Sequence, residues 1–138
     1  MTEPNEQYAY FTITGDFDPA DVSAELGTPA TECWLKGSVN PRTQRERKFS
    51  RWSLQSRLAR TCELEAHITD VIEQLEERKA AFIGLSLRHV ATMQLVAYFK
   101  TDYPGLHLDR VTVEALAEYA LDVDFDFYFW YSDKREDS

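Results

Sequence analysis

The last segment of the chain, LDVDFDFYFWY at residues 121–131, alternates strictly between two sets of side chains. The first set is apolar or aromatic and consists of Val123, Phe125, Phe127, Phe129 and Tyr131. The second set is acidic and then aromatic, and consists of Asp122, Asp124, Asp126, Tyr128 and Trp130. A period of two is that of a β-strand with one face against a core. The segment therefore predicts a sheet in which the first set lies beneath helices and the second set faces outward.

The remaining segments predict the rest of that sheet and the helices on it. Strand patterns occupy residues 8–15, 32–36, 49–54, 83–89 and 92–100. Helix patterns occupy residues 18–26, 62–79 and 109–120, each with a polar start and an apolar stripe. The predicted order is β-α-β-β-α-β-β-α-β. Its first six elements follow the split βαβ order of ferredoxin-like folds.

This order predicts a single α+β domain over residues 1–138, with a mostly antiparallel sheet and helices packed on one face. A chain of 138 residues with 43% hydrophobic content is long enough for one such core. The polar ends, residues 1–7 and 132–138, are expected to be frayed tails.

Several features predict a soluble protein of the cytoplasm with no membrane contact. No apolar run approaches the roughly 20 residues of a membrane span. The N-terminal MTEPNEQ has no Lys or Arg and differs from a secretory signal. The only cysteines, Cys33 and Cys62, are far apart, and we predict that both are buried and reduced.

The charge of the chain is unevenly distributed. The formal net charge is −9, yet residues 36–60 hold eight basic side chains opposed by a single acid. One interpretation is a solvated loop that offsets the acidic remainder. The other is a site for an anion or an acidic peptide, in which Arg47, Lys48 and Arg51 converge on Trp52.

The sequence carries no motif of common enzyme chemistry. It has no Gly-rich phosphate loop, no G-x-S-x-G, no C-x-x-C and no H-E-x-x-H, so we predict no cofactor, no metal site and no catalytic residue. The carboxylates of Asp122, Asp124 and Asp126 lie about 6.8 Å apart along a strand, too far apart to share one ion. We expect His67 to be structural, whereas His107 in the loop PGLHLD is a candidate for binding.

Several ordered motifs together resemble one bacterial family. YFTITGDFDP, LGTPAT, WLKG, RWSLQS and PGLHLD, closed by the acidic and aromatic strand, resemble the family catalogued as domain of unknown function 4279 over nearly the whole chain. The resemblance implies a small α+β protein without an established activity. The positions that match the family pattern are Gly15, Asp16, Asp18, Pro19, Trp34, Gly37, Trp52, Ser53 and His107. In the family an acid often follows Trp-Ser-Leu, whereas Gln55 stands there in this chain, which argues against a general acid at that position.

The leading hypothesis is a non-enzymatic protein-interaction domain of the immunity-like or regulatory kind. The expected interaction face consists of Tyr10, Tyr98, Asp124, Asp126, Tyr128 and Trp130. Its carboxylates suit a basic protein partner, and its aromatic content also suits a homodimer. The same carboxylates repel phosphate, which argues against nucleic acid.

The alternative hypothesis is a small-molecule or anion-binding protein, with or without enzymatic activity. Its pocket consists of Asp16, Arg47, Arg51, Trp52 and His107. This hypothesis requires the end of the first strand, the basic strand and the late loop to meet in space.

Overall fold

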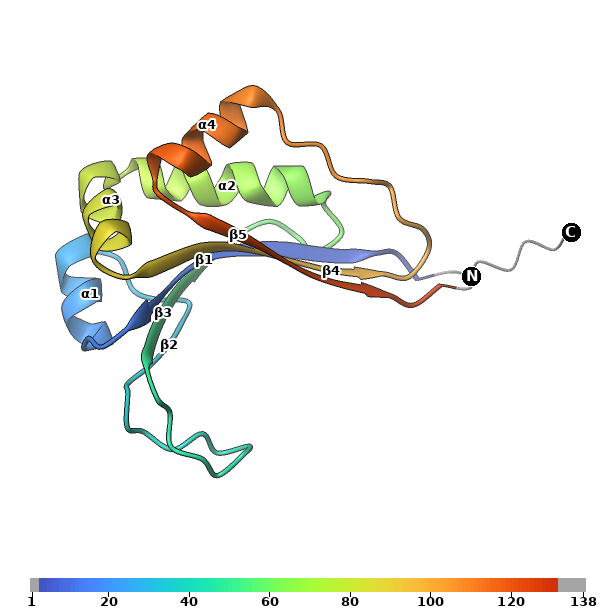
Figure 1. The fold of residues 1–138 in the computed structure, drawn as a ribbon. Helices are drawn as coiled ribbons and strands as arrows, with labels where there is room; N and C mark the ends of the chain where they lie inside the picture. Colours follow the sequence, from blue (N-terminus) through green and yellow to red (C-terminus); the bar gives the residue numbers. More distant parts are fainter. Residues whose placement is uncertain (1–2, 132–138) are drawn as a thin grey trace, which may run out of the picture.

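The computed structural model describes residues 3–131, which form five strands and four helices (Figure 1). In chain order the elements are β1 (Glu6–Gly15), α1 (Pro19–Leu26), β2 (Glu32–Trp34), β3 (Ser50–Gln55), α2 (Leu64–Glu76), α3 (Lys79–Arg88), β4 (Val90–Phe99), α4 (Arg110–Glu118) and β5 (Asp122–Phe129). Figure 1 shows α2, α3 and α4 above the sheet, whereas the segment between β2 and β3 extends below it.

The five strands form one sheet in the order β2-β3-β1-β4-β5. β3 pairs antiparallel with both β2 and β1, so β1 and β2 run in the same direction with β3 between them. This is the split βαβ arrangement, and it confirms the ferredoxin-like start. β4 pairs antiparallel with the other edge of β1, and β5 is added parallel to β4. The predicted α+β class and the mostly antiparallel sheet are thereby confirmed.

The predicted strand at residues 83–89 is wrong, because α3 occupies this segment. Phe82, Leu85 and Ser86 are buried at the spacing of one helix face, whereas Leu87 is 72% exposed. Apolar residues at 83, 85 and 87 imitate the alternation of a strand, but the chain buries positions i, i+3 and i+4 instead. The observed order is therefore β-α-β-β-α-α-β-α-β.

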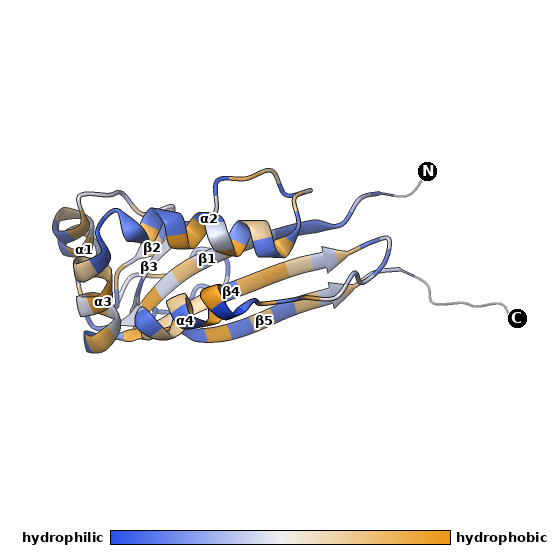
Figure 2. Cartoon of the chain, turned by 90° about the horizontal axis from the view of Figure 1, so that it is seen from above, coloured by the Kyte–Doolittle hydropathy of each residue, from blue (hydrophilic) through white to orange (hydrophobic). Residues whose placement is uncertain are grey.

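The core lies between the helices and the upper face of the sheet. Phe11 of β1, Trp52 of β3 and Phe82 of α3 are at most 1% exposed. Their ring centroids lie 5.2–6.3 Å apart, so three elements meet in one aromatic cluster. Seen from above in Figure 2, the helices lie over the sheet, and β5 alternates between hydrophilic and hydrophobic residues.

Two of the helices begin at aspartate caps, as their sequences predict. Asp18 Oδ1 accepts a hydrogen bond from the backbone N–H of Ala20 at 2.9 Å, and Asp109 Oδ1 accepts one from Thr112 at 2.8 Å. Each bond satisfies a backbone donor that the first helical turn leaves free. The caps therefore define where α1 and α4 start.

The start of β1 is tied to the end of β4. Asn5 Oδ1 accepts hydrogen bonds from the backbone N–H groups of Lys100 and Thr101 at 2.7 and 2.9 Å. Residues 6 and 7 belong to β1, which corrects the prediction that 1–7 is a frayed tail. Residues 1–2 and 132–138 lie outside the described residues.

The prediction of two buried thiols is also wrong. Cys33 is exposed and Cys62 is half-buried, and both are free. Cys33 belongs to β2, a three-residue strand at the edge of the sheet. As for membranes, none of the helices in residues 3–131 has the length and apolar character needed to span one.

Candidate functional site

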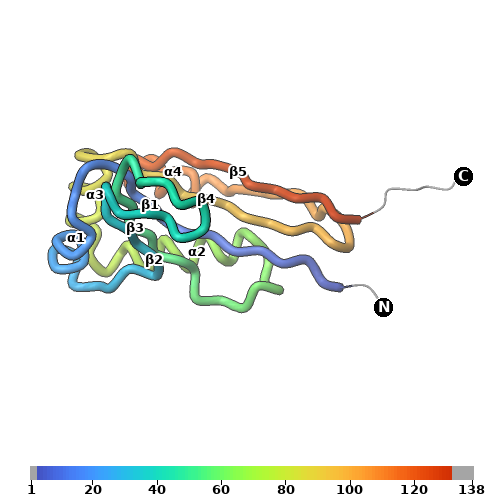
Figure 3. The backbone as a smooth tube through the Cα atoms, turned by 90° about the horizontal axis from the view of Figure 1, so that it is seen from below, coloured from blue at the N-terminus to red at the C-terminus, as the bar shows by residue number. Residues whose placement is uncertain are grey.

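One face of the sheet has no helix over it within residues 3–131, and we call it the open face (Figures 1 and 3). Strand alternation decides which side chains lie there. Because Ala9 and Phe11 of β1 are buried in the core, Tyr8 and Tyr10 lie on the open face. The strand register then continues this face across the sheet to β5.

The β5 side of the open face carries a group of residues that we call the acidic patch. It consists of Tyr98, Asp122, Asp124, Asp126, Tyr128 and Trp130. The Tyr98 ring centroid lies 5.0 Å from those of both Tyr128 and Trp130, and Trp130 is 61% exposed. Within residues 3–131 none of the three aspartates forms an ion pair. The patch therefore presents unpaired carboxylates beside accessible aromatic rings.

All six residues of the predicted interaction face lie on the open face. Tyr10 stands apart from the other five, because it belongs to β1 and Gln94 of β4 lies between it and Asp124. Two strand spacings, about 10 Å, separate β1 from β5. Tyr10 instead lies near the guanidinium of Arg51, with 5.8 Å between the guanidinium carbon and the ring centroid. The binding role of the six residues stays a prediction.

The other side of β5 is only partly covered by the helices. Val123 and Phe127 are half-buried, whereas Phe125 and Phe129 are 56% and 54% exposed. The prediction placed these side chains on the correct side of the sheet but overestimated their burial. The reason is that β5 is the outermost strand of the sheet. It is therefore an edge strand with accessible rings on both faces.

The β2–β3 side carries a second group, which we call the basic cluster. It consists of Trp34, Arg45, Arg47, Lys48 and Arg51. The guanidinium carbon of Arg47 lies 4.6 Å from the centroid of the Trp34 ring, and that of Arg51 lies 5.3 Å from it. Each such cation–π contact contributes about 0.5–1 kcal/mol at an accessible site. Trp34 thus contacts the guanidinium groups of both Arg47 and Arg51.

The predicted convergence of the basic residues on Trp52 is wrong. Trp52 is fully buried on the helix side, and its indole Nε1 donates a hydrogen bond to Ser23 Oγ of α1 at 3.0 Å. Neighbouring residues on a strand face opposite sides of the sheet, so Arg51 points away from Trp52. Trp34 pairs with Arg51 across β2 and β3 and supplies the ring instead.

The structure does not assemble the predicted five-residue pocket. Asp16 follows β1, its side chain is 81% exposed, and it forms an ion pair with Lys36 at 3.2 Å. His107 precedes α4, and its backbone N–H donates to Glu65 Oε2 of α2 at 3.0 Å. This contact places His107 in the helix layer, whereas the basic cluster lies on the open-face side (Figure 1). The pocket that required these residues to meet is therefore contradicted.

Charge changes sign across the open face. Arginines lie on the β3 side and aspartates on the β5 side, and three strand spacings, about 14 Å, separate these two strands. The rings of Tyr8 and Tyr10, with centroids 6.2 Å apart, lie between them, and the Arg60 guanidinium carbon is 4.1 Å from the Tyr8 ring centroid. Burial raises the pKa of Tyr8 and of Tyr10, so both phenols are neutral near pH 7.

A serine–histidine pair lies where β3 leads into α2. His67 Nδ1 lies 2.6 Å from Ser56 Oγ, and the backbone N–H of Ala9 donates to the same oxygen at 3.3 Å. Ser56 Oγ therefore links the backbone of β1 to the His67 ring. His67 is 0% exposed, so a substrate does not reach its ring. The pair ties β3 to α2, and the structural role predicted for His67 is confirmed.

The described residues offer no preformed metal site. Within residues 3–131, no group of three or more His, Cys, Asp or Glu side chains is arranged to hold an ion. The three aspartates of the acidic patch follow one another along β5 and do not converge.

Sequence reasoning missed Trp34 as the aromatic member of the basic cluster. The signal was present in ECWLK and FSRWSL, two predicted strands on either side of the basic loop. An antiparallel pair brings residues on either side of a connecting loop opposite each other. Pairing outward from the loop matches Trp34 with Arg51, as the structure does.

Comparison with known proteins gives one match. No curated protein and no solved structure matches the chain significantly. A family model matches residues 5–130, which include every strand, every helix and both groups of open-face residues. The chain therefore belongs to the family described as a domain of unknown function, DUF4279.

Proposed function

We propose that this chain is a non-enzymatic protein-interaction domain, of the immunity-like or regulatory kind, and that the acidic patch binds a basic protein partner. One observation carries the proposal. The open face has no helix over it within residues 3–131, and there exposed rings lie beside three unpaired carboxylates. The family description names no activity, so the proposal rests on this surface.

The chemistry of the patch defines the partner. Exposed Trp and Tyr side chains supply rigid apolar contact area, and such residues are enriched among those that contribute most to binding. Asp122, Asp124 and Asp126 attract Lys and Arg side chains, and the net charge of −9 speeds the approach of a basic protein. The partner is therefore a protein whose contact surface combines basic and apolar side chains.

The open face can supply more than half of the contact area of a specific complex. Four strands about 4.8 Å apart and about 25 Å long present roughly 500 Å² of flat sheet, and side-chain relief enlarges this area. A standard interface takes about 800 Å² from each partner. We place the complex in the cytoplasm, because a reducing compartment keeps the exposed thiol of Cys33 free.

The test is co-purification of the tagged chain with proteins of its source cell at low and moderate salt. We expect a stoichiometric complex with one basic protein, weakened by salt because solvent screens the charges at its rim. In the double variant Asp124→Lys and Asp126→Lys, affinity falls by at least about tenfold, since close charged pairs at interfaces couple by more than 1.4 kcal/mol.

The matched control changes the same charge on the other side of the molecule. Glu73 of α2 and Glu114 of α4 are exposed helix residues that form no ion pair within residues 3–131. The double variant Glu73→Lys and Glu114→Lys should bind the partner as the unaltered chain does. If the acidic-patch variant binds the partner as tightly as the unaltered chain, the patch is not the binding surface. The same holds if both double variants lose affinity equally.

A further inference from the structure

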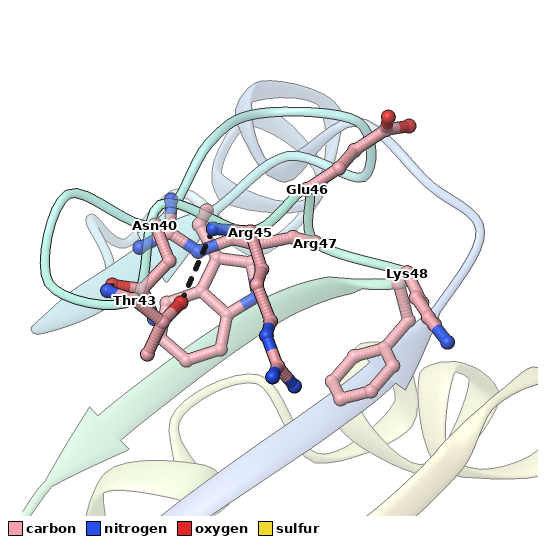
Figure 4. A pocket seen from close by; sticks show the side chains of 8 residues that line it. Asn40, Thr43, Arg45, Glu46, Arg47 and Lys48 are labelled. Carbon is pink, nitrogen blue, oxygen red and sulfur yellow. Dashed lines mark hydrogen bonds between the residues drawn. The ribbon is translucent and has the colours of Figure 1, made fainter.

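The segment between β2 and β3, residues 35–49, is an ordered hairpin extension that encloses a pocket. Two backbone hydrogen bonds close its base: the Gly37 N–H donates to Arg47 O, and the Arg47 N–H donates to Ser38 O, each at 2.8 Å. The pocket has a volume of about 250 Å³. The segment that lines most of it extends from the sheet on the side opposite α2, α3 and α4 (Figure 1). It is lined by Trp34, Asn40, Thr43, Arg45, Glu46, Arg47, Lys48 and Phe49 (Figure 4).

No carboxylate of the described residues neutralises the cations of this pocket. Within residues 3–131, Arg45, Arg47 and Lys48 all lie more than 4.0 Å from any Asp or Glu oxygen. The carboxylate of Glu46 points away from the pocket in Figure 4. Several like charges gathered without a counter-charge repel one another and attract an anion.

Two buried N–H groups in the same pocket also have no acceptor. Trp34 Nε1 and Arg47 Nε are shielded from solvent and form no hydrogen bond within the described residues. Buried donors are almost always paired, and each unpaired one costs about 1–3 kcal/mol. The Arg47 guanidinium carbon lies 4.6 Å from the Trp34 ring centroid, so the two unpaired donors belong to side chains in contact with each other. The side chains that shield these donors have to move aside when an anion enters.

We propose that this pocket binds the phosphate group of a small molecule. A phosphate monoester carries a charge of about −1.5 to −2 and three acceptor oxygens, which suits several cations and two free donors. Small-molecule sites start at about 300 Å³, so a volume of about 250 Å³ suits a compact ligand. The rings of Trp34 and Phe49 form an apolar wall for its carbon part.

The test follows the indole N–H signals of nitrogen-15-labelled protein during titration with inorganic phosphate and with phenyl phosphate. The chain has three tryptophans, and a Trp34→Phe variant identifies the Trp34 signal. We expect the Trp34 signal to move in a saturable way, whereas those of Trp52 and Trp130 stay fixed. Phenyl phosphate should bind more tightly than inorganic phosphate, because its ring adds contact with the apolar wall.

Variants that each remove one positive charge distinguish a specific phosphate site from general electrostatic attraction. Arg45→Gln or Arg47→Gln should weaken phosphate binding by at least about tenfold, the loss expected for one charge-assisted hydrogen bond. Arg42→Gln removes the same charge from the same loop outside the pocket lining, and should leave binding unchanged. The Arg45 side chain forms no hydrogen bond within the described residues, so its variant keeps the loop intact.

Three results would overturn the proposal. The first is a Trp34 signal that does not move, and the second is the same movement with chloride at equal ionic strength. The third is an equal loss of binding in the Arg42→Gln variant. The titration needs no protein partner, so it succeeds or fails independently of the acidic patch.

Discussion

Asp70 of α2 is a buried carboxylate held by Arg57. Its side chain is 8% exposed, and Arg57 donates to it from Nη2 at 2.7 Å and from the backbone N–H at 2.8 Å. Burial alone would raise the pKa of Asp70, but the hydrogen bonds from Arg57 outweigh this effect and lower it. A lowered carboxyl pKa stabilises the fold above the ordinary value of 3.8, and this stabilisation disappears as the pH falls through the lower folded value.

We predict that Asp70→Asn lowers the free energy of unfolding by about 2 kcal/mol near neutral pH, since it removes a charge-assisted pair. The difference from the unaltered chain should shrink as the pH falls below 3.8 and then through the lower folded pKa of Asp70. Urea unfolding at neutral and acid pH measures both values. The exposed neighbour Glu73→Gln is the control and should change stability by less than about 0.5 kcal/mol. An equal loss at both pH values would contradict the ionic role of Asp70.

His67 makes the fold sensitive to mild acid. Burial lowers the pKa of His67 below its ordinary value of 6.5, with backbone contacts opposing the effect. The unfolded chain therefore takes up the proton first, so stability falls as the pH drops from about 6.5 towards the folded value. We predict that His67→Gln flattens this fall, as measured by urea unfolding from neutral to mildly acid pH. The exposed His107→Gln should keep the original slope, and an unchanged slope in His67→Gln would refute the assignment.

At the scale of the element, α1 depends on its two ends. Asp18 caps the first turn, and Gly27 ends the helix in the left-handed conformation with φ 65°. We predict that Asp18→Ala lowers the free energy of unfolding by about 1 kcal/mol, the usual value of such a cap. The matched variant Asp16→Ala breaks only an exposed ion pair and should have little effect. Urea unfolding of both variants measures the two changes. An equal loss of unfolding free energy in the two would show that the cap does not stabilise α1.

The secondary structure of α3 could not be predicted from its own sequence pattern alone. Its sequence KAAFIGLSLR fits a strand by alternation and a helix by the spacing of Phe82 and Leu85. The hydrophobic pattern of so short a segment does not distinguish the two. The choice is made by packing, because the buried side of α3 lies against β4 and α1. The caps of α1 and α4, in contrast, act within one helical turn, so the sequence alone predicts them.

At the scale of the whole molecule, the outer edge of β5 has no partner strand within the described residues, and it could pair with a second copy of the chain. It is eight residues long and exposes Phe125 and Phe129, which favours pairing with a second edge. Charged residues on edge strands prevent such pairing. We predict that the unaltered chain is monomeric in sedimentation equilibrium, and that the double variant Asp124→Ser and Asp126→Ser self-associates.

The control for that prediction is Glu73→Ser with Glu114→Ser, which removes the same charge from the helix side and should stay monomeric. A dimer of the unaltered chain that dissociates with salt would contradict the prediction. It would show that the open face binds a second copy through arginines on one side and aspartates on the other.

The candidate site could be read from the sequence only in part. The alternation of β5 correctly placed the aspartates and aromatic rings of the acidic patch on one side of the sheet. The same reasoning joined Arg51 to the wrong tryptophan, because Trp52 is its chain neighbour and Trp34 is its neighbour across the sheet. Side-chain alternation assigns a residue to a face, but it does not say which strand lies next to it.

The sequence by itself determined most elements, the helix caps and the two faces of β5, because periodicity and capping act between residues a few positions apart. Only the tertiary structure decided that β5 lies parallel to β4 at the edge, that α3 is a helix, and that Trp34 lies between arginines beside unpaired donors. These features depend on pairing and packing between segments far apart in the chain. The contacts that stabilise them form only in the assembled fold, so the sequence of a single segment does not determine them.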